Sequence, residues 1–220
     1  MRITTDFAMI ALVLFAFAYR VSIKGVDAHE YIGFSAFLAF AAHNIINRRW
    51  YANIAKGGFN ARRIITTACN LALALAIITL ILTGLAQSRK LLSFLSLSGS
   101  IELRKIHTTA AYWSLILLST HIGIHWQILI NAARKTAGNI NERLFTLFSR
   151  VLGFFIIAFG VWSSFDRAMF SKLFMGFSFD YWDMRRPAVL FFIMTLSIMC
   201  LYIFLTHYAL KLISVKRRKK

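Results

Sequence analysis

Long apolar runs separated by short polar or aromatic segments make up almost the whole sequence. Six of these runs approach the length of about 20 residues that an α-helix needs to cross about 30 Å of hydrocarbon. They cover residues 6–23, 28–46, 64–86, 106–130, 145–165 and 188–213. Because no remaining segment resembles a soluble domain, residues 1–220 are predicted to form one all-α integral membrane domain, a bundle of about six transmembrane helices.

Two runs and two of the breaks need separate comment. The first run could be a cleaved signal peptide, but residues 17–20 (FAYR) contain no small-x-small cleavage site, so we expect a retained span. The fifth run contains Arg150 near one end, and this side chain must reach the headgroups or pair inside the bundle. The breaks at 87–105 and 166–187 are rich in aromatic residues and are predicted to lie on the membrane surface.

Composition and charge support a membrane protein. The chain is 59% hydrophobic with a mean hydropathy of +0.65, which exceeds the values of soluble domains. A net charge of +18 suits nucleic acid as well as membrane, but the cationic residues lie between apolar runs and at the tail, where they set topology and attract anionic lipid. No nucleic-acid partner is expected. One side of the predicted bundle collects 16 of the 26 Lys and Arg residues, so both termini are expected in the cytoplasm.

Histidines, not cysteines, carry the candidate chemistry. The two cysteines, Cys69 and Cys200, lie in separate apolar runs, so the chain has no disulfide framework, no CxxC metal motif and no C-x-x-C-H for covalently bound haem. All six histidines lie in or at the ends of predicted spans, where an ionisable side chain is costly without a partner. They are His29, His43, His107, His121, His125 and His207.

Four of the histidines have matched spacing. His29 and His43 are 14 residues apart in the second run, and His107 and His121 are 14 residues apart in the fourth. Fourteen residues of helix rise about 21 Å and return to within about 40° of the same face. Because one complete span separates the two runs, their helices are expected to run in the same direction. One histidine of each helix then lies at each of two depths.

Each depth therefore offers two facing imidazoles, which is the axial ligand set of six-coordinate haem iron. Two depths predict two b-type haems, with His29 and His107 at the outer level and His43 and His121 at the inner level. The two haems would form an electron path across the bilayer. Hydrogen bonding between helices explains any one intramembrane histidine, but it does not explain the repeated spacing.

The residues around the four histidines suit this interpretation. Small side chains on the same faces leave room for a flat macrocycle; they are Gly33, Ala36, Ala110, Ala111 and Ser114. Arg104 with Lys105 flanks the outer level and Arg48 with Arg49 flanks the inner level, where cations can pair with haem propionates. Lys and Arg are common at any span end, so the cations add less than the spacing does.

The other histidines have different expected roles. His125 lies one turn beyond His121 on nearly the same face, so it is an alternative inner ligand or a partner for a propionate or a quinone. We favour His121 because it completes the matched spacing. His207 has no matched partner and is expected to be structural or interfacial.

Acidic residues near the outer level allow two interpretations. Glu30 and Asp27 either accept quinol protons or stabilise a helix start through its dipole. Residues 177–183 (FSFDYWD) suit a cover for the outer haem, a docking segment or an interfacial aromatic belt.

Several short motifs resemble the bacterial flavinylation-associated cytochrome family. They are residues 28–33 (AHEYIG), 43–44 (HN), 47–50 (NRRW), 83–84 (TG) and 121–126 (HIGIHW). The likeness covers essentially the whole chain and extends, more distantly, to di-haem cytochrome b subunits of respiratory complexes. Residues 20–25 (RVSIKG) depart from the family because they lack its usual Thr-Gly.

This resemblance implies a cytochrome-b-like core in the bacterial inner membrane. It implies haem-ligand roles for the four matched histidines, and His125 also matches a family histidine. It further implies quinol as the electron donor and an extracytoplasmic protein with covalently bound flavin as the acceptor.

Three functional hypotheses follow. The leading one is electron transfer from quinol, through two b haems, to an extracytoplasmic redox protein. The second makes the chain a cytochrome b anchor subunit of a membrane dehydrogenase that reduces quinone. The third is a haem-free transporter or channel whose intramembrane histidines relay protons or bind metal, and it predicts a colourless protein.

Overall fold

The computed structural model describes residues 2–18, 26–58, 60–91, 93–95, 100–137, 142–176, 182–183 and 185–218. Regular structure in these residues is entirely helical. The elements are α1 (Arg2–Phe17), α2 (Val26–Ile46), α3 (Arg48–Ala52), α4 (Ala61–Ala86), η1 (Ser93–Leu95), α5 (Ile101–Ile124), α6 (Trp126–Ala137), α7 (Glu142–Asp166), α8 (Met169–Leu173) and α9 (Ala188–Arg218). Residues 20–25 and 177–181, which entered the sequence interpretation, lie outside the described part.

Length and composition identify candidate membrane-spanning helices. Among the described residues, three helices are long and apolar enough to cross a membrane, and they are Ala61–Ala86, Ser149–Asp166 and Ala188–Ile213. The bent pair α5 and α6 passes the same test if it counts as one span. Thus three to four helices meet the criteria, where the apolar runs predict six. Helix α1 is apolar but short, and α2 carries His29, Glu30, His43 and Asn44, which lower its hydropathy.

The fourth predicted run, 106–130, is not one straight helix. The helix is interrupted at His125, and the axis of α6 is bent by 59° from that of α5. At the break the His125 backbone N–H donates to the Ile122 carbonyl at 3.1 Å, and the Arg62 guanidinium donates to the Ile124 carbonyl at 3.3 Å. These bonds satisfy carbonyls that lose their helical partners at the end of α5. The run contains no proline, so composition alone did not locate the break.

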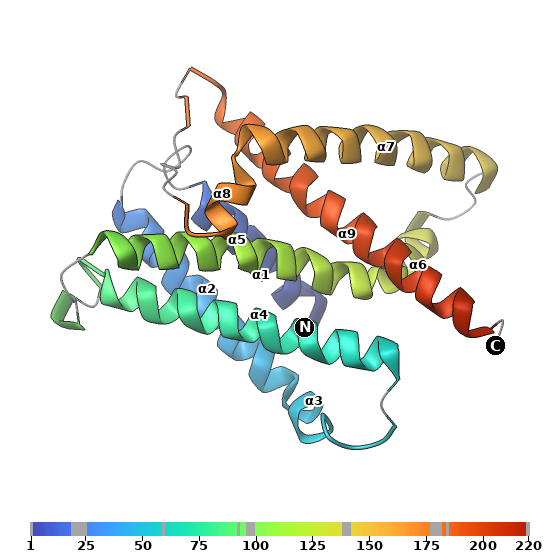
Figure 1. Ribbon diagram of the computed structural model, residues 1–220, viewed down its shortest axis with the longest axis horizontal. Coiled ribbons are helices and arrows are strands. Elements are labelled where there is room, and N and C mark those ends of the chain that lie inside the picture. Colours follow the sequence, from blue (N-terminus) through green and yellow to red (C-terminus); the bar gives the residue numbers. More distant parts are fainter. Residues whose placement is uncertain are drawn as a thin grey trace.

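The long helices are arranged as two hairpins, α1–α2 and α4–α5, and a third unit formed by α7 and α9. Helix α1 packs on α2, α4 packs on α5, and α9 packs on both α5 and α7 (Figure 1). Helices α2 and α5 begin at the end of the bundle where α4 ends, so α2 and α5 run in the same direction (Figure 1). This confirms the predicted parallel orientation of the two histidine-bearing helices.

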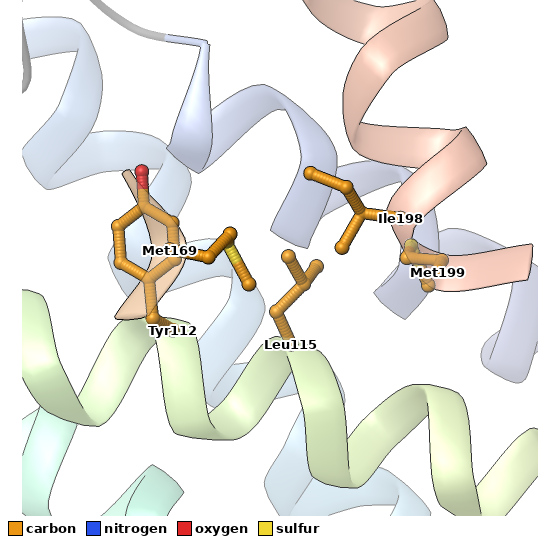
Figure 2. Close-up of a cluster of buried hydrophobic side chains, with 5 residues drawn as sticks. All are labelled: Tyr112, Leu115, Met169, Ile198 and Met199. Atoms are coloured by element: carbon orange, nitrogen blue, oxygen red, sulfur yellow. The ribbon is translucent and has the colours of Figure 1, made fainter. Parts of the chain in front are cut away.

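An apolar core joins three of these elements. Tyr112 and Leu115 from α5 meet Met169 from α8, together with Ile198 and Met199 from α9 (Figure 2). All five side chains are at least nine-tenths buried. The core fixes α5 from the side opposite to α4, so the histidines of α5 are carried on a helix that is packed on two sides.

Two glycines allow α9 to approach its neighbours. A Cβ at Gly123 of α5 would lie 2.8 Å from the Ile203 carbonyl oxygen, and a Cβ at Gly160 of α7 would overlap the Ser197 carbonyl oxygen. Small residues let membrane helices pack backbone to backbone. The third unit is therefore held by close contacts that larger residues would break.

We predict that Gly160→Ala destabilises the protein by about 1 to 3 kcal/mol, because the added methyl must push α7 away from α9. Thermal unfolding of the detergent-purified protein measures this effect. Gly153→Ala is the matched control on the same helix: nothing lies within 4 Å of its Cβ position, so its midpoint should equal or exceed that of the wild type. Equal midpoints for the two variants would contradict the described α7–α9 contact.

Candidate functional site

The structure brings the two outer histidines together. The rings of His29, near the start of α2, and His107, near the start of α5, have centroids 6.1 Å apart and planes at 79°. A ligating imidazole nitrogen lies about 2 Å from its metal and the ring centre about 1 Å further back, so two rings on one metal have centres about 6 Å apart. The separation of the two ring centres therefore matches that of two imidazoles bound to one metal.

The inner level gathers His43, His121 and a carboxylate. The His43 Nδ1 lies 2.8 Å from an Asp6 carboxylate oxygen, and the His121 Nδ1 lies 2.8 Å from the Asn70 side-chain oxygen. His43 and Asp6 are both close enough to His121 for direct electrostatic interaction. The four matched histidines are all half-buried.

Each matched histidine has its Nδ1 engaged by the helix that precedes it. On α2, His29 bonds the Ala16 carbonyl at 3.1 Å, and His43 bonds Asp6, both on α1. On α5, His107 bonds the Thr83 hydroxyl at 2.8 Å, and His121 bonds Asn70, both on α4. The pattern of the α1–α2 hairpin is thus repeated in the α4–α5 hairpin.

These partners define which ring nitrogen carries the hydrogen. A carbonyl, a carboxylate and an amide oxygen only accept, so Nδ1 donates in three of the four bonds. The Thr83 hydroxyl donates to the Thr79 carbonyl at 2.7 Å, so it accepts from His107 in the fourth. A neutral imidazole that donates from Nδ1 carries its lone pair on Nε2, which is the usual arrangement of a histidine that ligates metal.

Sequence reasoning missed all four Nδ1 partners. Asp6, Asn70 and Thr83 are polar residues inside apolar runs, near the depths of the histidines that they contact. That coincidence of depth was a usable signal. Ala16 contributes only its backbone carbonyl, so no side-chain pattern could have identified it.

The donor set suits haem. Among the described residues no group of three or more His, Cys, Asp or Glu side chains is arranged to hold a metal ion. Each histidine pair supplies two neutral nitrogen ligands, which is the number that porphyrin-bound iron takes from protein. The residues of the outer pair therefore fit a haem, and at the inner level Asp6 and Asn70 hold the Nδ1 atoms of two further imidazoles.

The small residues around the ligands are not equivalent. The Cβ position of Gly33 on α2 faces open space, as the sequence interpretation requires. On α5, Ala110 and Ser114 are each only 7% exposed, so they are enclosed by helix packing and offer no face to a macrocycle. Room for a planar group therefore lies on the α2 side.

The predicted propionate partners are at the bundle surface. Arg48 on α3 and Arg104 on α5 are both exposed, and Lys105 pairs with Glu102 at 3.2 Å. The cation that approaches the inner level most clearly is one that sequence reasoning missed: Arg62, which bonds the end of α5 and interacts electrostatically with His125.

The remaining histidines occupy other positions. His125 lies at the bend after α5 and is exposed, with its ring 5.1 Å from the His121 ring. His207 lies on α9, where its ring contacts Tyr208 at 5.4 Å. In the described structure His207 contributes to neither pair.

Glu30 holds the turn that follows α4, at the outer end of the bundle. Its carboxylate accepts the Ser88 hydroxyl at 2.9 Å and the backbone N–H groups of Arg89, Lys90 and Leu91 at 2.7, 3.1 and 3.2 Å. These four bonds fasten the start of α2 to the turn after α4. The side chain of Asp27 lies outside the described part.

The aromatic segment before α9 is described only in part. Trp182 is buried and packs edge-on against Phe191 at 5.3 Å, so this aromatic belongs to the core and not to an exposed belt. Beside it lies a cavity of about 280 Å³, lined by Asp166, Arg167, Ala168, Lys172, Trp182, Asp183 and Arg186. Arg167 and Lys172 both donate to the Tyr112 hydroxyl, which ties this cavity to the core.

Compared with known protein families, with curated proteins and with solved structures, the chain matches none of them.

We predict that Glu30→Gln lowers the stability of the protein by about 1 to 3 kcal/mol. The two carboxylate oxygens together accept four hydrogen bonds, and the variant replaces one of these oxygens with an NH₂ group that cannot accept. Glu102→Gln is the control, since this exposed residue makes only an i,i+3 pair that is worth about 0.5 kcal/mol or less. Thermal unfolding compares them. An unchanged midpoint in Glu30→Gln would mean that the turn at 88–91 is not held by this carboxylate.

Proposed function

We propose that this chain is a di-haem b-type cytochrome that carries electrons across a membrane. His29 and His107 hold one haem, and His43 and His121 hold the other. The observation that carries the proposal is the outer pair, because two half-buried imidazoles from parallel helices lie at the ring separation of axial ligands.

The protein residues do three things in this proposal. The imidazoles bind through Nε2, and their Nδ1 bonds to α1 and α4 hold each ring in its orientation. The apolar helices around them keep water from the path. Bound haem supplies reversible one-electron exchange between ferrous and ferric iron.

Topology and redox partners complete the proposal. We infer six spans, with α1 and α2 crossing beside the apolar helices, both termini in the cytoplasm and a bacterial inner membrane as the location. The distribution of Lys and Arg supports this orientation. Quinol as donor and an extracytoplasmic flavin-bearing protein as acceptor rest on the family resemblance alone.

One observation favours a haem-free transporter. The bend at His125 gives α5 and α6 the form of a broken span or a re-entrant loop, and broken helices commonly form the substrate sites of transporters. Two facing histidine pairs are not needed for that function. A colourless purified protein is the outcome that would select it.

We predict two b haems per chain in protein purified from a haem-replete host, measured by reduced-minus-oxidised and pyridine haemochrome spectra. His43→Ala or His121→Ala should leave one haem, and His29→Ala or His107→Ala should leave the other, because each level has its own pair. His207→Ala is the matched control and should retain both.

The same spectra also distinguish the alternatives. Absence of haem from the wild type contradicts the proposal. Retention of two haems in His121→Ala with loss of one in His125→Ala would reassign the inner ligand to His125.

The proposed topology predicts different access to two engineered cysteines. Phe94→Cys lies in η1 at the outer end, where Phe94 is 80% exposed, and should react with a membrane-impermeant maleimide in intact cells with a permeabilised outer membrane. Lys56→Cys, exposed between α3 and α4, should react only after lysis. The wild type is the background control, since Cys69 and Cys200 lie within helices. The reverse labelling pattern would invert the orientation.

A further inference from the structure

Helix α6 separates apolar from polar side chains around its axis. At 3.6 residues per turn, its large apolar and polar residues fall mainly in two opposite arcs, each about 100° wide or less. The apolar arc contains Trp126, Leu129 and Ile130, and the polar arc contains Gln127, Asn131 and Lys135. Ile128 lies just beyond the polar arc. A helix with this division is most stable at a boundary between water and an apolar medium.

The described part of the protein leaves both arcs accessible. Leu129 is 39% exposed, and Trp126 and Ile130 are only partly buried. On the polar arc, the Gln127 side-chain amide donates to the Asn131 side-chain oxygen at 3.0 Å, one turn further along the same helix. The apolar arc therefore still needs an apolar medium, and the polar arc is open to solvent or to headgroups.

The length of α5 sets the depth at which α6 begins. The first turn of α5 is polar and exposed at Glu102, which pairs with Lys105 at 3.2 Å. Residues 106–124 then rise about 28 Å, which is close to the thickness of about 30 Å of a hydrocarbon core. Helix α5 is thus long enough to cross the membrane without α6, and the hydrocarbon ends near Ile124.

The neighbouring helix marks the same depth independently. The Arg62 guanidinium, in the first turn of α4, donates to the Ile124 carbonyl at 3.3 Å. The long apolar stretch of α4 begins after Arg63. Cations at a span end lie at the level of the headgroups. Helix α6 therefore begins at the membrane surface.

The bend directs α6 along that surface. Its axis turns by 59° from that of α5, which is less than the right angle beyond which the chain would lead back toward the bilayer centre. A span tilt of about 20°, which is ordinary for membrane helices, brings α6 close to the membrane plane. It lies at the inner end of the bundle, where α5 and α9 end and α7 begins (Figure 1).

The charge of this segment complements anionic lipid. Residues 126–141 contain Arg134 and Lys135 and no acidic residue, and the Lys135 side chain is exposed. A cation near a membrane surface attracts the phosphate groups of anionic phospholipids. The polar arc thus presents positive charge at the depth of these groups.

We propose that α6 is an interfacial helix that binds anionic phospholipid at the inner end of the bundle. The apolar arc enters the acyl chains, Trp126 lies at the headgroup level, and Lys135 pairs with lipid phosphate. The fourth span then ends near Ile124 instead of continuing to residue 130. The proposal does not depend on bound haem.

Spin labels on opposite arcs test the placement of α6. Leu129→Cys and Asn131→Cys are each labelled with a nitroxide in the full-length protein, reconstituted into phosphatidylglycerol–phosphatidylcholine nanodiscs. The label at 129 should be more accessible to oxygen, which concentrates in lipid, and the label at 131 to a water-soluble nickel chelate. The wild type is the background control, since Cys69 and Cys200 lie within helices.

Three outcomes of this experiment would overturn the placement. Nickel access at both sites would mean that α6 stands away from the membrane. Oxygen access at both would make it a re-entrant segment. Shielding of the label at 129 from both reagents would mean that protein, such as a second copy of the chain, covers the apolar arc.

Quenching by labelled lipid tests the lipid class. A fluorophore at Leu129→Cys should be quenched more by doxyl-phosphatidylglycerol than by doxyl-phosphatidylcholine at the same mole fraction. Lys135→Gln should lower this preference about fivefold, because a cation near the surface loses its attraction to the anionic lipid. Lys56→Gln removes an exposed cation between α3 and α4 and should retain the preference.

Two results would contradict the lipid assignment. Equal quenching by the two lipids in the wild type would remove the anionic preference. An equal loss of preference in Lys56→Gln and Lys135→Gln would assign it to the whole inner end and not to α6. Neither measurement uses haem, so both results leave the proposed electron-transfer function untouched.

Discussion

The hydrogen bond at Nδ1 of each matched histidine is the constraint on which the arrangement of the first two hairpins depends. A polar ring inside an apolar bundle is costly unless its nitrogen atoms are engaged. Here each ring on α2 bonds α1, and each ring on α5 bonds α4. In α1 and in α4 the partner nearer the helix start bonds the inner histidine and the partner nearer the helix end bonds the outer one, so the bonds fix the antiparallel register of both hairpins. The rings can then face each other because their other sides are already held.

The rest of the chain supports α5 from behind. Helix α9 packs on both α5 and α7, and α8 contributes Met169 to the core. Arg167 and Lys172, both buried, donate to the Tyr112 hydroxyl at 3.2 and 2.9 Å, and the Arg167 guanidinium lies 4.3 Å from the centre of the Phe191 ring. Cation–π contacts of this kind are strongest where water is excluded. The α7–α9 unit therefore acts as a scaffold, while the candidate redox chemistry belongs to the two hairpins.

The helical fold and the two histidine levels could be predicted from sequence because both depend on helical periodicity. Apolar runs located the long helices, and the one complete span between the two histidine-bearing runs predicted that their helices share one direction, which the structure confirms. Periodicity gives depth and face, but it does not tell which neighbour reaches a given ring. For that reason Asp6 and Asn70 were missed.

Features that depend on tertiary contacts were predicted less well. The bend at His125 has no proline to mark it, and it coincides with a hydrogen bond from Arg62, which is 62 residues distant from Ile124 in sequence. Ala110 and Ser114 are small and lie on the expected face, yet the packing of α5 buries them. Trp182 has the composition of an interfacial belt but lies in the core. In each case local composition was compatible with two environments, and packing selected one.

The most direct measurement of the central claim is an experimental structure of the haem-replete protein, with anomalous scattering at the iron edge. The account predicts two iron peaks about 20 Å apart. One should lie between the Nε2 atoms of His29 and His107, and the other between those of His43 and His121. Iron at another position would contradict the account. So would the absence of iron from a structure in which the histidine rings at both levels are ordered.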